Sequence, residues 1–417
     1  MTSRPGTILR LWKRSKTSPT SRRSLHLHTF QSQALLKEVG IPVPRDITAR
    51  SVDEVREAMR WLGGPCFIKP QFIQTIHGRR QLSSGIPAEI DFAKNPEDGA
   101  TIAARMLGYE LLPGYPGERE HMIKHVDVLE SIPYDRNWKL CMTIDRENYC
   151  PTIILIEDGS IVRSQTMEHC ILPYSFPFGF TEGITPALTK RIADRMSLPD
   201  AEATNLKQVL QGLYQIFVNE EATSLDIDDL VRRSADGQLM CMNSRFTFDD
   251  AAQSRQPDIF ALRDFEQEVS EEVEAEQHGL VYVRMDGNIG NVVNGAGLAM
   301  ATNDAISHYG GKSANFLDAG GKATTDTMLR AFDIILRDER VTAILVNIYG
   351  GLTRCDMIAE SIIAAASELG PLVVPVVVRL QGTNSEEGLA MLEQANLGLY
   401  VEAGFGEAAK KAVEVAT

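Results

Sequence analysis

Short hydrophobic runs alternate with segments of helical periodicity throughout the last third of the chain. Strands are predicted at "LVYVRM", "NVV", "ANFLDAG", "AILVNIY", "VVPVVVRL" and "LYVEA", with predicted helices between them such as "TDTMLRAFDIILRD" and "CDMIAESIIAAASELG". Strands that alternate with helices of this length indicate βαβ units, which form a parallel sheet with helices on both faces. We therefore expect a doubly wound α/β domain over residues 280–417. Ligands of such sheets bind beyond the carboxyl ends of the strands.

The pattern before residue 264 is mixed. A predicted helix, "FQSQALLKEVG", and a second one from Val52 precede the strand "PCFIKPQF", which carries Lys69. Farther along, the strand-like runs "WKLCMTID", "TIILIED" and "QLMCMNSRF" accompany the helix "NLKQVLQGLYQIFVNE". This mixture predicts an α+β domain over residues 28–263.

A strongly acidic stretch separates the two patterns. Seven of the thirteen residues from Asp264 to Glu276 are acidic. Such a run is typical of a solvated linker or an exposed helix, and it marks the expected domain boundary. We assign residues 264–279 to an acidic linker.

The start of the chain has a different composition from the rest. Between Met1 and Lys37 there are eight Lys or Arg residues, eleven Ser or Thr residues, and no Asp or Glu. Basic, hydroxyl-rich and acid-free composition is typical of a mitochondrial transit peptide, and a basic disordered tail is the alternative. We expect a transit peptide over residues 1–27 and a mature protein in the mitochondrial matrix.

Composition narrows the classes of partner. The net charge is −14, which argues against nucleic acid as a partner. No apolar run approaches the length of a membrane span, so no membrane association is expected. The six cysteines form no CxxC pair and no zinc spacing, which suggests reduced structural thiols.

The segment "NIYGGLTRCDMIAESIIAAA" places Gly350 and Gly351 between a strand and a helix. Helical spacing of Cys355 and the apolar residues after it predicts one buried face, and Thr353 is expected to cap the helix with Asp356 as its capping-box partner. The amides of the first turn would then offer hydrogen-bond donors to an anion, which glycine lets approach closely. A tight turn would need glycine as well.

Two further glycine loops follow predicted strands of the same domain. Asn294-Gly295 follows one strand, and Gly320-Gly321 follows another. Three glycine loops at the ends of three strands suggest a shared polar surface for a phosphorylated or carboxylate ligand.

The residues from Met285 to Thr324, together with "NIYGGLTRCDMIAESI", closely resemble the β subunit of succinate–CoA ligase. The resemblance continues more weakly through "LHTFQSQALLKEVGIPVP" and "CFIKPQ". It implies an N-terminal ATP-grasp domain, a C-terminal flavodoxin-like domain, and a partner α subunit whose histidine carries a phosphoryl group. It also implies that Asn294, Gly351, Leu352 and Thr353 contact the acid substrate or the phosphoryl group.

The nucleotide half departs further from the family. Lys69 matches the strand lysine that contacts the triphosphate, a role suited to a mobile point charge. In "IHGRRQLSSG", Gly78 and Arg79 match a glycine-dense phosphate loop, but Arg80 stands where the family has glycine. Fewer glycines leave fewer backbone amides free to surround phosphates, which puts triphosphate use in question.

The magnesium pattern has exchanged its residue types. Asp228, in "DIDD", stands for a family asparagine, and Asn243, in "MNSR", stands for a family aspartate. One carboxylate and one amide oxygen remain, both ligands that Mg²⁺ accepts. The resemblance therefore implies a surviving Mg²⁺ site, and an acidic strand end is the alternative reading.

Together these features predict a subunit that makes succinyl-CoA from succinate and CoA at the expense of ATP or GTP. Two alternatives stay open: a ligase subunit for another carboxylic acid, and a catalytically impaired regulatory relative.

Overall fold

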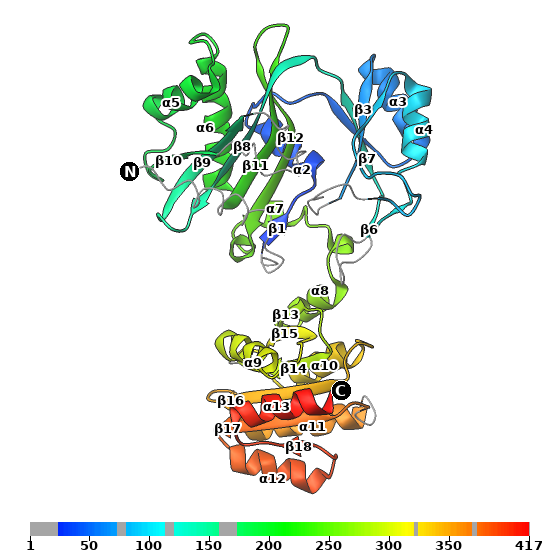
Figure 1. Cartoon of the computed structure of the whole chain (residues 1–417), viewed down its shortest axis with the longest axis vertical. Coiled ribbons are helices and arrows are strands. Elements are labelled where there is room, and N and C mark those ends of the chain that lie inside the picture. Colours follow the sequence, from blue (N-terminus) through cyan, green and yellow to red (C-terminus); the bar gives the residue numbers. More distant parts are fainter. Residues whose placement is uncertain are drawn as a thin grey trace. The chain divides into compact units, whose positions relative to one another are not determined.

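The computed structural model describes residues 24–72, 81–112, 121–157, 173–320, 324–368 and 373–416. The described residues up to Arg263 form one compact unit and those from Asp264 form a second (Figure 1). Gly78, Arg79 and Arg80 lie outside the described residues, as does most of the expected transit peptide. No helix in the described ranges is both long enough and apolar enough to cross a bilayer.

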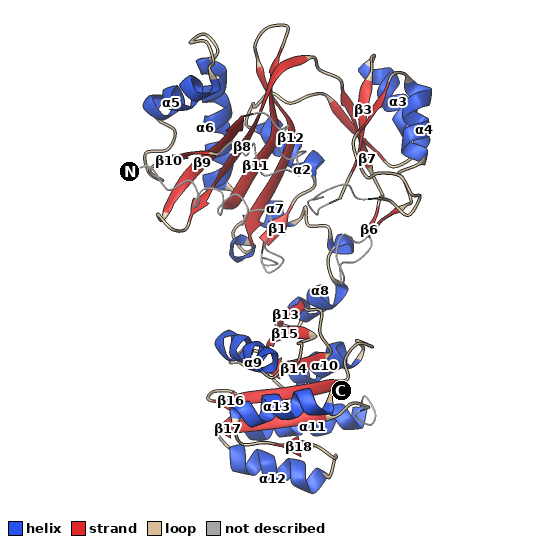
Figure 2. Cartoon of the chain, viewed as in Figure 1, coloured by secondary structure: helices blue, strands red, loops and turns tan. Residues whose placement is uncertain are grey.

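The first unit is built on an antiparallel sheet of six strands. Their order is β1 (Ser24–His26), β12 (Leu239–Asp249), β11 (Ala222–Arg233), β8 (Tyr134–Asp145), β9 (Cys150–Glu157) and β10 (Tyr174–Pro177). One hydrophobic core joins this sheet to three helices, α2 (Thr29–Glu38), α5 (Pro186–Met196) and α6 (Ala203–Asn219) (Figure 2). The strands and helices predicted here from the sequence are confirmed.

A smaller antiparallel sheet completes the first unit. Its order is β2 (Asp46–Ala49), β7 (Val126–Glu130), β3 (Cys66–Pro70) and β4 (Asp91–Ala93), and it packs with α3 (Val52–Leu62) and α4 (Pro96–Ala104). A short pair follows, β5 (Glu110–Leu111) with β6 (His121–Met122), and after the large sheet come η3 (Asp250–Ala252) and α7 (Pro257–Phe260). Lys69 lies on β3, the predicted strand.

The second unit contains the predicted parallel sheet. Four strands lie in the order β14 (Ile289–Val293), β16 (Ala343–Gly350), β17 (Val376–Gly382) and β18 (Tyr400–Val401). Two separate cores cover its two faces. One contains residues of α10 (Thr325–Leu336), α11 (Cys355–Glu368) and α12 (Ser385–Ala395), and the other contains residues of α9 (Ala296–His308) and α13 (Phe405–Val415) (Figure 2).

Two strands expected in the parallel sheet form a separate antiparallel pair. They are β13 (Val281–Arg284) and β15 (Asn315–Asp318). Side-chain amides replace much of the ladder between β14 and β15: Asn291 N donates to Asn315 Oδ1 at 2.9 Å, and Asn315 Nδ2 donates to Asn291 O at 2.9 Å. Because these side chains take the backbone partners, β15 follows β14 without a regular parallel ladder.

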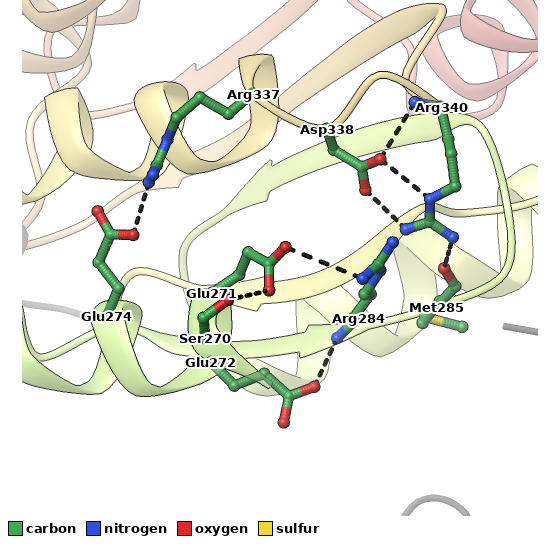
Figure 3. Close-up of polar contacts among 9 residues, drawn as sticks. All are labelled: Ser270, Glu271, Glu272, Glu274, Arg284, Met285, Arg337, Asp338 and Arg340. Atoms are coloured by element: carbon green, nitrogen blue, oxygen red, sulfur yellow. Dashed lines mark hydrogen bonds and ion pairs between the residues drawn. The ribbon is translucent and has the colours of Figure 1, made fainter. Parts of the chain in front are cut away.

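Most of the acidic stretch is not a bare linker. After the short turn η4 (Phe265–Gln267), residues Ser270–Gln277 form helix α8, which contacts β13 and α10. Glu274 Oε2 lies 2.6 Å from Arg337 Nη2, and Glu272 Oε1 accepts a hydrogen bond from the Arg284 amide at 2.9 Å (Figure 3). The acidic side chains are thus paired with groups of the second unit, which makes α8 part of that unit.

Candidate functional site

The two glycines after β16 meet different requirements. A Cβ on Gly350 would lie 2.9 Å from both Cys355 Sγ and Thr383 N, so close packing requires glycine there. A Cβ on Gly351 would meet no atom of the described residues within 4 Å, and the φ of Gly351 lies outside the left-handed region. Neither packing nor backbone strain explains Gly351. Glycine there leaves the peptide backbone accessible to another molecule.

Thr353 does not cap α11, contrary to the sequence prediction. The amide of Ile358 bonds to Arg354 O at 3.2 Å, so helical hydrogen bonding begins one residue later than expected. Asp356 accepts instead from Arg354 and from Asn384, and the Arg354 hydrogen bond holds the pKa of Asp356 at about 2. Thr353 is only 2% exposed, and its buried hydroxyl has no hydrogen-bond partner among the residues that the structure describes.

Leu352 lies between Gly351 and Thr353, and its side chain is exposed whereas Thr353 is buried. Its relative exposure is 86%, so it contributes nothing to either core of the second unit. The loop therefore has an accessible backbone at Gly351, followed by an exposed apolar side chain at Leu352 and a buried hydroxyl at Thr353.

Asn294 holds this loop in place from the neighbouring strand. Its Oδ1 accepts from the Tyr349 amide at 2.9 Å, and its Nδ2 donates to Tyr349 O at 2.9 Å. This reciprocal pair ties the end of β14 to the end of β16. The structure therefore places Asn294 beside the loop, and the predicted contact of Asn294 with the substrate or the phosphoryl group stays a prediction.

The other two glycine loops, at Gly295 and at Gly320, are less open to an anion than we expected. The Asp318 carboxylate accepts from the Gly295 amide at 2.6 Å and from the Gly320 amide at 2.7 Å. An acidic side chain thus uses both backbone donors. Gly321 lies outside the described residues. Of the three loops, the loop after β16 offers the clearest place for an anionic group.

Lys69, in the first unit, is held in place rather than mobile. Its Nζ donates to Thr29 Oγ1 at 2.8 Å and to Asn243 Oδ1 at 2.6 Å, so it links β3 of the small sheet to α2 and β12 (Figure 1 labels all three). Loss of hydration lowers the pKa of Lys69 to about 8, and the carboxylates of Asp127 and Asp228 oppose that change.

Asp127 is a buried carboxylate that the sequence did not single out. It lies opposite Lys69 in the β3–β7 ladder and accepts from Thr48 Oγ1 at 2.8 Å and Gln71 Nε2 at 2.5 Å. Burial raises the pKa of Asp127 to about 6, against the lowering effect of Lys69. The alternation of "VDVLE" predicts a strand, but an acid on its buried face could be found only from the pairing of β7 with β3.

Asp228 and Asn243 do not fit a magnesium site as they are placed. Asp228 Oδ2 accepts from Arg245 Nε at 2.8 Å and lies 2.7 Å from Arg245 Nη2, while Lys139 Nζ lies 3.6 Å from Oδ1. The Asn243 oxygen accepts from Lys69. Mg²⁺ needs oxygens that face the cation, and these oxygens face protein cations. Within the described ranges, no three His, Cys, Asp or Glu side chains gather as metal ligands would.

A bulge in the sheet explains why the two expected ligands, Asp228 and Asn243, are not paired across β11 and β12. The β11–β12 register shifts between Ile227 and Asp229, and Asp229 is the residue paired with Asn243. Asn243 Nδ2 accordingly lies 3.5 Å from Asp229 Oδ2. The alternation of polar residues in "DIDD" does not reveal this shift.

Known proteins resemble this chain over nearly its whole length. Residues 26–232 match the ATP-grasp domain family and residues 292–416 match the CoA-ligase family. The chain is 36% identical over 393 residues to the protein named succinate–CoA ligase [ADP-forming] subunit beta of Cupriavidus taiwanensis, covering 94% of this chain and 99% of that protein. A mitochondrial protein of the same name from Neurospora crassa is 34% identical, with 95% and 89% covered.

A solved structure supports the same architecture. ATP citrate lyase from Methanothrix soehngenii superimposes with a TM-score of 0.70 at 15% identity, covering 94% of this chain and 100% of that one. At this identity the likeness shows the fold alone: an ATP-grasp domain followed by a flavodoxin-like domain. With the sequence relatives at more than a third identity over almost their full length, the chain belongs to the family of succinate–CoA ligase β subunits.

Proposed function

We propose that the chain is the β subunit of a succinate–CoA ligase that works with an α subunit. The reaction is succinate + CoA + nucleoside triphosphate giving succinyl-CoA + nucleoside diphosphate + phosphate, with a histidine of the α subunit carrying the phosphoryl group. The observation that carries this proposal is the loop after β16, where Gly351 leaves the backbone accessible and the buried Thr353 hydroxyl has no partner in the described part of the chain. Such a loop suits a ligand that brings its own acceptor oxygens.

The loop residues have separate roles in this proposal. Thr353 donates its hydroxyl hydrogen to the phosphoryl group or the substrate carboxylate. Gly351 lets that anion approach the backbone, and Leu352 shields it from water. Asn294 fixes the loop through its paired hydrogen bonds with Tyr349, so the donors are in place before the anion arrives.

In the first unit we propose that Lys69 binds the nucleotide phosphates, together with Gly78, Arg79 and Arg80. The relatives named ADP-forming favour ATP over GTP. CoA is the thiol substrate. Mg²⁺ is the usual companion of such nucleotides, but the contacts of Asp228 and Asn243 give no reason to place it on them.

The cellular location and the limits of the domains are part of the proposal. The basic, acid-free start of the chain supports a transit peptide over residues 1–27, and the Neurospora relative is named mitochondrial. We propose the mitochondrial matrix as the location. The ATP-grasp domain would span residues 28–263. The contacts of α8 favour a ligase domain that begins at Asp264 rather than at residue 280.

The test is a reconstituted heteromer of the chain with its α subunit. Succinyl-CoA formation would be followed with ATP and with GTP, over a panel of dicarboxylic acids. We expect turnover with succinate, and a loss of about tenfold or more in kcat/KM for Gly351→Ala, since a Cβ there would obstruct the anion. Turnover confined to another acid would favour the first alternative. Heteromer assembly without any turnover would favour the regulatory relative.

A further inference from the structure

The Lys69 ammonium is held from two sides by neutral oxygens. Thr29 Oγ1 lies 2.8 Å from Nζ and Asn243 Oδ1 lies 2.6 Å from it. Thr29 is buried at the first position of α2, and Asn243 lies within β12, whereas Lys69 comes from β3 of the other sheet. Helix α2 and strand β12 of the first unit thus fix the ammonium of a lysine on strand β3.

The geometry leaves capacity for a ligand. An ammonium has three N–H donors, and these two contacts use two of them. Neither acceptor is charged, so neither neutralises the ammonium. A phosphate oxygen could accept the third hydrogen without breaking either contact.

Fixing the ammonium also has an energetic consequence. A lysine side chain loses considerable rotamer freedom when it binds a ligand from solution. Here the fold has already restricted that freedom, so less affinity is lost when the phosphate binds.

The same contact gives Asn243 a different role from the one its position suggests. Its amide oxygen faces Lys69, and the nearby Asp228 carboxylate is paired with Arg245 and Lys139. An amide oxygen at this position accepts from an ammonium, whereas a resident divalent cation would compete with that ammonium for the same oxygen.

We propose that Thr29 and Asn243 are positioning residues that hold the Lys69 ammonium ready for a nucleotide phosphate, and that Asn243 holds no resident metal. The proposal rests on the nucleotide-dependent function proposed above. It adds Thr29, which nothing else assigns to the site, and changes the role of Asn243.

The main test compares Thr29→Val with Thr29→Ser in the full chain bound to its α subunit. Valine keeps the shape but removes the acceptor, whereas serine keeps the acceptor. Calorimetric titration with ATP should show about tenfold weaker binding for Thr29→Val, and the nucleotide KM should rise by a similar factor while kcat changes little. Thr29→Ser should remain within about threefold of the wild type.

These results separate positioning from a general structural role. If Thr29→Val binds ATP as the wild type does, or if Thr29→Ser is equally impaired, the proposal is wrong. A wild-type protein that binds no ATP also overturns it. If ATP binding depends on Thr29 but no succinyl-CoA forms, the proposed function fails while this inference stands.

The metal part has its own measurement. Electron paramagnetic resonance with Mn²⁺, in the absence of nucleotide, should show no tightly bound ion in the wild type. A stoichiometric Mn²⁺ signal that disappears in Asn243→Leu would overturn the new role for Asn243. In the ATP titration, Asn243→Leu should weaken binding because it removes the acceptor oxygen beside Lys69. Asn243→Asp should also weaken it, because a carboxylate there neutralises the ammonium and repels the phosphate.

Discussion

At the scale of single residues, Thr353 carries a hydroxyl that the fold does not use. A buried hydroxyl without a partner costs about 1–3 kcal/mol relative to one that is paired. Thr353→Val should therefore raise the free energy of unfolding by about 1 kcal/mol. If the hydroxyl serves a ligand, the same change should lower kcat/KM for succinate by about tenfold or more. Chemical denaturation and steady-state kinetics of the heteromer measure the two effects.

Thr302→Val is the matched control for Thr353. The Thr302 hydroxyl is also buried, but it donates to Leu298 O at 2.7 Å and accepts from Asn347 Nδ2 at 2.8 Å. Its loss leaves the Asn347 Nδ2 group without this acceptor and should destabilise the protein by about 1–2 kcal/mol. If Thr353→Val is destabilised to the same degree, its hydroxyl has a structural role and the argument for a ligand fails.

Asp127 predicts how stability depends on pH. Burial raises its pKa to about 6 in the folded protein, above the ordinary value of 3.8. Between these values the folded state binds more protons than the unfolded state, so this group lowers stability as pH rises from about 4 to about 6. Relative to the wild type, Asp127→Asn should gain about 2 kcal/mol of unfolding free energy between pH 4.5 and pH 7, as measured by denaturation at both pH values. A difference independent of pH would contradict this assignment.

At the scale of elements, Gly388 allows α12 to approach the start of α11. A Cβ on Gly388 would lie 2.7 Å from Cys355 O and 3.1 Å from Asp356 N. Backbone atoms cannot move aside as a side chain can, so Gly388→Ala should cost about 1–3 kcal/mol in unfolding free energy. Gly297, in α9, is the control, since a Cβ there meets nothing within 4 Å. Gly297→Ala should gain up to about 1 kcal/mol, and equal effects of the two variants would disprove the contact.

The elements themselves could largely be predicted from the sequence, because their periodicity reflects which face is buried. The spacing from Cys355 to Ala366 predicted α11, and the structure confirms that helix. The predicted cap at Thr353 was wrong because helical hydrogen bonding begins at Arg354. Backbone hydrogen bonds of Gly350 and Cys355 to Thr383, on another loop, set this start. The contact between β14 and β15, which replaces the predicted parallel ladder, depends on the side chains of Asn291 and Asn315. Local patterns do not contain such contacts between distant segments.

The candidate site likewise contains some residues that the sequence could bring together and some contacts that it could not. Asn294, Gly351 and Thr353 follow strands in one sheet, so the topology alone predicts that they come together. The contacts of Lys69 with Thr29 and Asn243 join segments 40 and 174 residues apart. The bulge beside Asp228 also changes which acid lies next to Asn243. Residue types at aligned positions do not determine such contacts.

At the scale of the whole molecule, the division into two units places the second unit's start at Asp264 rather than at residue 280. Both of its cores lie within residues 264–417, and Ala275 of α8 is buried in one of them. A fragment 264–417 should therefore unfold in one cooperative thermal transition. A fragment 280–417 loses the buried Ala275 and the contacts of Glu272 and Glu274 with Arg284 and Arg337.

The shorter fragment should melt at least about 4 °C lower, as expected for a loss of about 1–2 kcal/mol in a domain of this size. Circular dichroism and calorimetry would measure both fragments at low and at high salt. Because exposed ion pairs contribute little and are screened by salt, the part of the difference that persists at high salt measures the packing of α8. Equal melting temperatures would mean that α8 is an exposed linker after all, as its acidic composition alone suggests. A difference that disappears with salt would mean that charge alone holds the helix.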